Sequence, residues 1–393
     1  MIRHIDHHHR IALITMILLT LCAPVALHAQ AQAQAQTQVQ PRDSATPLSV
    51  ERLYHGVNRT AMIRIDAPPR DGTLSLILMQ HDGDVVAGPY SVRPGRLDLA
   101  DRFPRFWSHR DTLYLQLLID DEPFGSALVI QPMLSRPTLR TEQATRPDGV
   151  TQYTRIVGWG RDPDAIPPAD PPDAADNDDT APSEPDEEVR HFTGYRIYID
   201  HDVMLRTDHG DIRIAMRPDE APNTAWNFLE LARGGFYRDV IFHRIVPATR
   251  DGWPFVIQAG DPSAGGSGGP GYWLPIEPST LEHDFGVISM ARADHPDSAG
   301  SQFFICLSRE GTSRLDGQYC AFGYAVDGAL TIQAIAETRL SETNLERPAE
   351  PPMIRDAIAI PAPPRTPGVG RPDQRVHVIL DDDTPPTPVR IPR

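Results

Sequence analysis

The sequence predicts a mainly β protein with two β-rich domains. Short apolar runs, some alternating with a period of two, recur along residues 48–140 and 196–360, and turn-forming residues separate them. Only two segments have helical periodicity. At 393 residues the chain is long enough for two domains that each bury a core. We therefore expect a β-sandwich-like domain followed by a β-barrel that two helices cap.

Residues 1–31 have the pattern of a signal peptide. Arginines and histidines precede an apolar run over residues 11–21 that is too short to span a bilayer, and Ala29-Gln30-Ala31 matches a cleavage site. The alternative is an uncleaved membrane anchor. We expect export to the periplasm or the medium, without stable membrane insertion. Residues 32–47 are an Ala/Gln-rich linker that cannot form a core.

Residues 48–140 predict the β-sandwich-like domain. Four strands are expected, at residues 61–65, 73–79, 112–119 and 126–130, separated by turn sequences. We find no catalytic group of residues here and expect an interaction or packing module. Its clustered acids could be calcium ligands, but acids in turns usually stabilise the turn itself; they are Asp82, Asp84, Asp120 and Asp121.

Two further segments lack apolar residues for a core. Residues 141–195 are rich in Asp, Glu and Pro and predict an extended acidic linker, and residues 361–393 predict a Pro-rich tail. The formal net charge of −16 argues against a nucleic-acid partner. Every basic residue is Arg, so chemistry that depends on a lysine Schiff base is excluded.

Residues 196–360 predict the barrel domain. A hairpin over residues 203–215 turns near residues 208–211, and Pro222 begins a helix that Gly234-Gly235 ends. A second helix is expected at residues 329–338. The remaining strands are expected at residues 240–246, 255–258, 286–290, 302–307 and 321–325. Cys306 and Cys320 are expected to be buried free thiols, although a disulfide is possible if their strands are neighbours.

Six short strings occur in order within this domain. They are Phe242-His-Arg-Ile-Val-Pro247, Phe255-Val-Ile-Gln-Ala-Gly-Asp261, the glycine-rich run over residues 265–271, Gly286-Val-Ile-Ser-Met-Ala291, Gly300-Ser-Gln-Phe-Phe-Ile305, and Leu315-Asp-Gly317 with Phe322-Gly323. This ordered set resembles the cyclophilin family of peptidyl-prolyl cis-trans isomerases. The resemblance covers roughly residues 203–360.

The resemblance implies a closed antiparallel eight-stranded β-barrel with two capping helices and a peptide groove on its outer face. It implies isomerisation of Xaa-Pro bonds, with Arg244 as the donor that stabilises the twisted amide. Such a reaction needs no nucleophile, metal or cofactor, because binding the twisted amide more tightly than either planar isomer suffices. The partners are proline-containing polypeptides, and we expect a monomer.

The resemblance also implies the site residues. Arg244, Phe255, Gln258 and Phe304 match the catalytic positions. Six further residues match substrate-binding positions, namely Val256, Ala291, Arg292, Gln302, Leu315 and Tyr319. The alternatives without a role in function are a surface ion pair for Arg244, core packing for the apolar residues and solvated strand positions for the glutamines. His243 is expected to pack beneath the groove.

The sequence departs from the family pattern at the rim of the groove. Arg292 replaces an Asn, Arg314 an aromatic residue and Tyr319 a His, and residues 248–254 are inserted before Phe255. Arg292 would add a charge to the groove, and the loss of the aromatic residue predicts poor cyclosporin binding. These departures leave two alternatives to catalysis: a catalytically weak binding module, or a groove that the chain's own Pro-rich linker or tail occupies.

Overall fold

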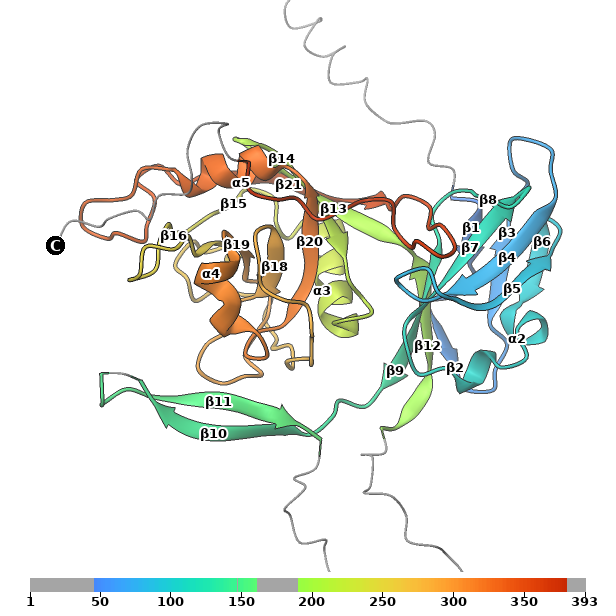
Figure 1. Cartoon of the computed structure of the whole chain (residues 1–393), viewed down its shortest axis with the longest axis horizontal. Helices are drawn as coiled ribbons and strands as arrows, with labels where there is room; N and C mark the ends of the chain where they lie inside the picture. Colours follow the sequence, from blue (N-terminus) through green and yellow to red (C-terminus); the bar gives the residue numbers. More distant parts are fainter. Residues whose placement is uncertain (1–45, 147, 161–189, 380–393) are drawn as a thin grey trace, which may run out of the picture. The chain divides into compact units, whose positions relative to one another are not determined.

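The computed structural model describes residues 46–146, 148–160 and 190–379. The predicted signal peptide, nearly all of the Ala/Gln-rich linker, residues 161–189 of the acidic linker and residues 380–393 of the tail lie outside the described residues. The described parts are mainly β, with few helices, as the sequence predicts (Figure 1). No helix in these parts is both long enough and apolar enough to cross a membrane.

Two antiparallel sheets are built mostly from residues 48–134. The smaller sheet has the order β1 (Leu48–Val50), β3 (Met62–Ile65) and β6 (Gly95–Asp98). The larger has the order β2 (Tyr54–Gly56), β12 (Phe192–Ile199), β9 (Leu128–Leu134), β7 (Leu113–Ile119), β4 (Leu74–Met79) and β5 (Val85–Ser91), with β8 (Glu122–Pro123) beside β7. Both sheets contribute to one apolar core, to which Leu48, Ile63, Leu76 and Leu115 belong. Two sheets over a shared core form a β-sandwich-like arrangement.

Strand β4 is buried on both faces. Leu76 and Leu78 belong to the core between the two sheets, whereas Ile77 and Met79 belong to the apolar cluster of the C-terminal sheet. Successive side chains of a strand point to opposite faces, so a strand buried on both sides needs a continuous apolar run. The run over residues 74–79 therefore contributes side chains to both apolar clusters.

Ordered strands occupy part of the predicted acidic linker. Strand β12, after residues 161–189, pairs with β9 and β2 of the larger sheet. Before them, β10 (Leu139–Thr145) and β11 (Gln152–Trp159) form a hairpin. The Gln318 side chain accepts from the Ile156 backbone N–H at 3.0 Å and donates to its carbonyl at 2.8 Å. The hairpin is thus contacted by a residue 162 positions away, and local sequence patterns do not signal contacts of this kind.

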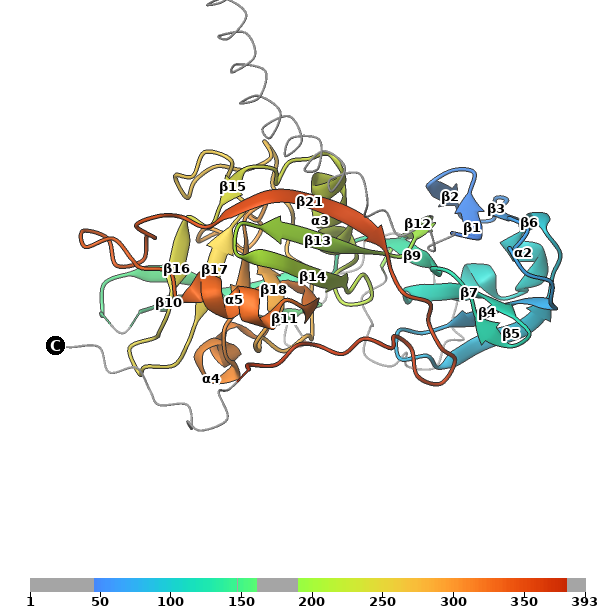
Figure 2. The ribbon, with the colours of Figure 1, turned by 90° about the horizontal axis from the view of Figure 1, so that it is seen from above.

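The C-terminal sheet has nine strands. Its order is β15 (Val240–Ile241), β21 (Met353–Pro361), β13 (His201–Thr207), β14 (Gly210–Met216), β20 (Ala321–Asp327), β18 (Val287–Met290), β19 (Phe303–Cys306), β17 (Val256–Ala259) and β16 (Arg244–Val246). Both ribbon views show β21, β13 and β14 side by side (Figures 1 and 2).

The prediction of a closed eight-stranded barrel is wrong. The sheet is a curled half-barrel whose two edges are β15 and β16. The cause lies in residues 240–246, which were expected to form one strand. Phe242 and His243 interrupt the ladder, so that Val240–Ile241 pair with β21 and Arg244–Val246 pair with β17 at the opposite edge.

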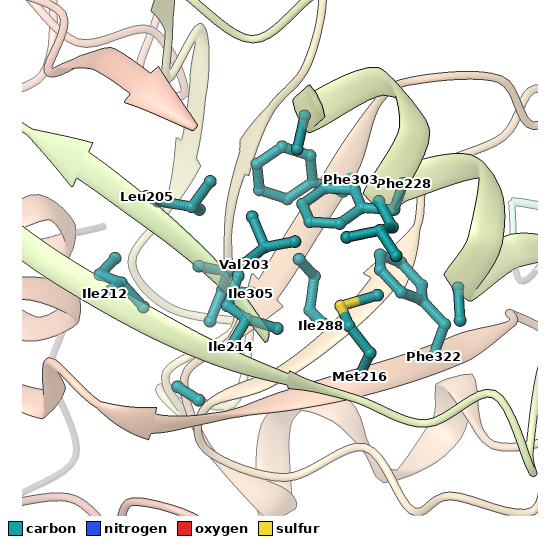
Figure 3. Close-up of a cluster of buried hydrophobic side chains, with 14 of the residues drawn as sticks. Val203, Leu205, Ile212, Ile214, Met216, Phe228, Ile288, Phe303, Ile305 and Phe322 are labelled. Carbon is teal, nitrogen blue, oxygen red and sulfur yellow. The ribbon is translucent and has the colours of Figure 1, made fainter. Parts of the chain in front are cut away.

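The core of the curled sheet lies on its concave side. Alternate side chains of its strands meet the apolar face of helix α3 there (Figure 3). The residues labelled in Figure 3 come from β13, β14, α3, β18, β19 and β20, and are Val203, Leu205, Ile212, Ile214, Met216, Phe228, Ile288, Phe303, Ile305 and Phe322.

Two helices occur where the sequence predicts them, α3 (Pro222–Arg233) and α5 (Ala329–Ala336). Pro222 is at the start of α3, where its missing N–H costs nothing. Glu277 accepts from the backbone N–H groups of Asn223 and Thr224 at 3.0 and 2.7 Å, which satisfies donors that the first helical turn leaves free. The remaining helical turns are α2 (Leu99–Arg102), α4 (Arg309–Thr312), η1 (Phe106–Ser108) and η2 (Ser313–Leu315).

Residues 362–379, which the sequence predicts to be part of the tail, form a segment that we call the strap. The Arg365 side chain is fully buried and its Nε donates to Asp200 at 3.0 Å. Arg371 donates to both carboxylate oxygens of Asp202 at 2.7 and 3.0 Å. The Val376 backbone N–H bonds to the Ala325 carbonyl at 2.9 Å. None of these partners is a predicted groove residue, so the strap does not fill the groove.

Cys306 and Cys320 are both buried and free, which confirms the expected pair of thiols. Cys306 ends β19 and Cys320 directly precedes β20, and β18 lies between these two strands. Burial raises the pKa of Cys320 to about 12 and that of Cys306 well above its usual range. Neither thiol is therefore prepared to act as a nucleophile.

Candidate active site

An apolar cluster covers the outer face of strands β17, β18 and β19. Along β17, Val256 belongs to it while Ile257 points into the concave core; on β19 the same alternation separates Phe304 from Phe303. We call this set the outer-face cluster. Its buried members are Val256, Val287, Phe304, Cys306, Leu315 and Ala321, and its partly buried members include Phe255, Ala291 and Tyr319.

The cluster brings together every apolar site residue that the sequence predicts. The Phe304 ring meets the edge of the Tyr319 ring at a centroid distance of 5.6 Å, and stacks on His283 at 6.0 Å. His283 is fixed in turn by Asp316 and by the Ser289 hydroxyl, each at 3.0 Å. His283 supports the Phe304 ring from a position that the sequence did not single out.

A line of polar side chains adjoins this cluster. Strand register places Arg244 opposite Gln258, and Gln258 opposite Phe304. Arg244 Nη1 donates to Gln258 Oε1 at 3.2 Å, and Gln258 Nε2 donates to Gln302 Oε1 at 3.0 Å. Gln302 Nε2 then donates to the carbonyls of Gly266 and Gly268. The three predicted polar residues thus form one hydrogen-bonded chain that ends at the glycine-rich loop.

The Arg244 guanidinium has a second anchor in Glu346. Its Nε donates to Glu346 Oε2 at 2.6 Å, and the Ile245 backbone N–H bonds to the Glu346 carbonyl at 2.8 Å. Within the described residues no partner is found for Nη2. Two anchors therefore orient the guanidinium and leave Nη2 available as a donor. Sequence reasoning missed Glu346, because an acid 102 positions away carries no local signal.

The glycine-rich loop is organised by the buried Asp261. One of its carboxylate oxygens accepts from Ser263 N–H and O–H at 2.7 Å each, and the other from the N–H groups of Gly266 and Gly268 at 2.5 and 3.0 Å. Burial alone would raise the pKa of Asp261, but these hydrogen bonds outweigh it and lower the pKa to about 2. The loop lines a cavity of about 900 Å³, together with Ala291, Arg292 and Gln302.

Replacing Asp261 with Asn is expected to loosen this loop. The amide keeps one acceptor but presents N–H groups to the donors of Gly266 and Gly268, which costs about 1–3 kcal/mol. Amide hydrogen exchange at Gly266 and Gly268 should accelerate roughly 5- to 150-fold. Because the folded pKa lies below the ordinary value of 3.8, the stabilisation by the wild-type carboxylate is complete above pH 3.8 and lost as the pH falls through about 2.

The control for that experiment is Asp251→Asn, which changes an exposed aspartate in the inserted loop. It should leave the exchange of both glycine amides unchanged. Equal exchange rates in wild type and Asp261→Asn would contradict the role of Asp261.

Arg292 lines the cavity, and backbone carbonyls of the rim hold its charged guanidinium in place. Its Nη1 donates to the carbonyls of Ala293 and Asp294, and its Nε and Nη2 donate to the Gln318 carbonyl, all at 3.0–3.3 Å. Its guanidinium also lies 4.7 Å from the centre of the Tyr319 ring. Arg292 thus joins two loops of the rim, because three of its nitrogens make four hydrogen bonds to backbone carbonyls.

The inserted residues 248–254 form a turn against helix α4. Thr249 N–H bonds to the Trp253 carbonyl at 2.8 Å, and the Ser308 hydroxyl donates to the Pro254 carbonyl at 2.7 Å. The insertion is therefore fixed at the Phe255 end of β17. Trp253 is only partly covered, with 37% of its surface exposed.

His243 is buried beside the glycine-rich loop, and neither ring nitrogen has a hydrogen-bond partner among the described residues. Burial lowers its pKa, so the ring is neutral at pH 7. This placement agrees with the expected packing role. Across the described ranges, no three His, Cys, Asp or Glu side chains are grouped so as to hold a metal ion.

Comparison with known proteins connects this geometry to a family. Residues 202–359 match the model of the family "cyclophilin type peptidyl-prolyl cis-trans isomerase/CLD". A Synechococcus elongatus peptidyl-prolyl cis-trans isomerase is 41% identical over 125 residues, which cover 32% of this chain and 80% of the relative. The Schizosaccharomyces pombe isomerase ppi1 is 37% identical over 163 residues, which cover 40% of this chain and 98% of the relative.

A solved structure is also similar. It is a cyclophilin-type isomerase of Cryptosporidium parvum, determined in the presence of the dipeptide Ala-Pro, with 31% identity over 40% of this chain and 98% of that chain, and a TM-score of 0.37. The two sequence relatives alone show the family, since each match spans most of the relative's length. The chain belongs to the cyclophilin-type peptidyl-prolyl cis-trans isomerase family.

Proposed function

We propose that this protein isomerises Xaa-Pro bonds of exported polypeptides, with Arg244 as the donor to the prolyl nitrogen. The observation that carries the proposal is the held guanidinium of Arg244. Glu346 and Gln258 fix its Nε and Nη1 beside the outer-face cluster, while Nη2 has no partner among the described residues. A donor held in place before substrate arrives needs no reorganisation during the reaction.

The outer-face cluster supplies the other half of the mechanism. Rotation about an Xaa-Pro bond faces a barrier of about 20 kcal/mol, because the amide nitrogen is conjugated with the carbonyl. The pyrrolidine ring would bind on Phe304, Val256 and Leu315, which excludes water from one side of the amide. In the twisted state the prolyl nitrogen regains its lone pair and can accept a hydrogen bond from Arg244. That bond is absent in either planar isomer, so it lowers the barrier without tightening ground-state binding.

The backbone around the proline would be held by the glutamines. Gln258 and Gln302 are only partly buried and line the cavity beside the cluster. Their mutual hydrogen bond fixes the side-chain amides before substrate binds. Holding the chain on one side while the other side rotates is a positioning effect, and it requires groups that are already oriented.

Two-dimensional exchange NMR of an Ala-Pro peptide tests the proposal. With catalytic amounts of the full chain, cis and trans resonances should show cross-peaks at mixing times where the free peptide shows none. Uncatalysed exchange takes tens to hundreds of seconds, so catalysis is easily separated from background. Exchange equal to that of peptide alone would refute the enzymatic proposal.

A catalytically weak binding module is the second candidate, and the Arg244–Glu346 ion pair favours it. A carboxylate oxygen 2.6 Å from Arg244 Nε partly offsets the electrostatic field of the guanidinium, which would weaken its stabilisation of the twisted amide. The same NMR samples distinguish the two candidates. Peptide chemical-shift changes without faster exchange would establish the binding module.

Export is the remaining part of the proposal, and it rests on the residue 1–31 pattern alone. Mass spectrometry of the protein from its native cells should find a mature N-terminus near residue 31. An intact N-terminus in the cytoplasmic fraction would contradict export.

A further inference from the structure

We propose that Arg314 selects substrates with an acidic residue one or two positions after the proline. The inference rests on the proposed function, because it concerns the same groove. The Arg314 guanidinium lies 4.6 Å from the centre of the Phe255 ring, and the Arg314 side chain is exposed. Phe255 in turn packs against the outer-face cluster. A cation is therefore held by a cation–π contact at the end of the groove.

The charge of Arg314 is not neutralised by the protein. Among the described residues it has no ion-pair or hydrogen-bond partner. Two other arginines of this domain have acidic partners: Arg309 pairs with Asp316 at 2.6 Å and Arg244 pairs with Glu346. Arg292 keeps its charge, but its guanidinium donors are used by backbone carbonyls. Arg314 is thus a stacked, solvent-exposed guanidinium without a protein partner among the described residues, in a chain with a formal net charge of −16.

Strand geometry indicates which substrate residue would reach it. Arg244 lies opposite Gln258 at one end of β17, and Phe255 precedes the other end of that strand. Three residues of a strand span about 10 Å. With the prolyl nitrogen at Arg244, an extended peptide covers the same length in two to three residues. If the peptide runs from Arg244 toward Phe255 after its proline, as we propose, the side chain that meets Arg314 belongs to one of the two residues after the proline.

The chemistry of that side chain follows from the guanidinium. Arg314 keeps all five N–H donors and its full charge, and a carboxylate accepts two of these donors in parallel. A Gln side chain of the same length offers one neutral oxygen and gains less. A basic residue there would be repelled. The expected ligand is a peptide with Glu or Asp after the proline.

Binding of two matched peptides tests the inference without requiring turnover. Dissociation constants of Ala-Ala-Pro-Glu-Glu and Ala-Ala-Pro-Gln-Gln are measured by NMR titration of the full chain at low salt. The wild type should bind the Glu peptide about two- to five-fold more tightly, as for an exposed ion pair. Arg314→Gln should bind both peptides equally, and Arg314→Glu should reverse the order. High salt should reduce the wild-type preference.

Arg206→Gln is the matched control, because it removes one positive charge from β13, which lies at a distance from β17 in the sheet order. Arg206→Gln should keep the wild-type ratio of the two dissociation constants. An equal ratio in wild type and Arg314→Gln would overturn the inference, whether or not the protein isomerises Ala-Pro. Conversely, loss of turnover with an intact Glu preference would refute the enzymatic proposal and leave the role of Arg314 standing.

Discussion

Arg244→Ala is expected to lower kcat/KM for an Ala-Pro peptide about 10²- to 10³-fold. The change removes a prepositioned donor whose hydrogen bond forms only in the twisted amide, and such donors contribute this much in other enzymes. The loss should be in kcat, with KM nearly unchanged, because in the proposed mechanism Phe304 and Val256 would bind both planar isomers and would remain in place. Steady-state kinetics with peptide enriched in the cis isomer measure both constants.

Two companion variants separate donor geometry from charge. Arg244→Lys keeps the charge but loses the planar group that Glu346 and Gln258 hold at two atoms, so it should remain impaired. Glu346→Gln removes the negative charge but keeps an oxygen for Nε. Because the ion pair is exposed, its effect should stay within about five-fold. A Glu346→Gln loss as large as that of Arg244→Ala would show that the ion pair, rather than the Arg244 donor alone, carries catalysis.

Arg365→Ala is expected to cost about 3–5 kcal/mol of the free energy of unfolding. Arg365 is fully buried, donates to Asp200 and to the His81 carbonyl, and lies 3.4 Å from the centre of the Tyr114 ring. Removing it leaves the buried Asp200 carboxylate without its cation, which is the costly way to break a buried pair. Urea denaturation followed by circular dichroism measures the change.

The matched control is Arg238→Ala, which removes an arginine whose contact with Asp356 is mostly exposed. Its cost should be below about 1 kcal/mol. The double variant Arg365→Met with Asp200→Leu should recover much of the lost stability, because no unpaired charge then remains buried. Equal stability of Arg365→Ala and wild type would contradict the structural role assigned to the strap.

Much of the C-terminal fold follows from local sequence. Helix α3 begins at Pro222 and ends before Gly234, as capping rules predict. The outer-face cluster also follows, because alternation along β17 and β19 assigns Val256 and Phe304 to one face. The role proposed for them does not follow from alternation. It follows from the resemblance, since periodicity alone identifies them only as packed residues.

The parts that sequence did not predict depend on contacts between distant residues. The predicted barrel does not close because Val240–Ile241 pair with β21 whereas Arg244–Val246 pair with β17. No local sequence pattern indicates that these neighbouring residues pair with different strands. The strap looks like a tail, since it has many prolines and few apolar residues. What orders it is the pairing of Arg365 and Arg371 with Asp200 and Asp202, 165 and 169 positions away.

The polar half of the site shows the same limit. Gln258 and Gln302 were predicted, but their hydrogen bond and its continuation to Gly266 depend on how β17, β19 and the loop meet. Arg292 was expected to add a charge to the groove. The structure adds that its guanidinium donates to the Ala293, Asp294 and Gln318 carbonyls, contacts that depend on how the rim loops meet.

The most direct test of the account is exchange NMR at protein concentrations that saturate an Ala-Pro peptide, with wild type and Arg244→Ala side by side. Both proteins should shift the peptide resonances equally, because both keep the outer-face cluster, but only the wild type should give strong cis–trans cross-peaks. Equal exchange in both proteins would contradict the claim that Arg244 drives isomerisation in this groove.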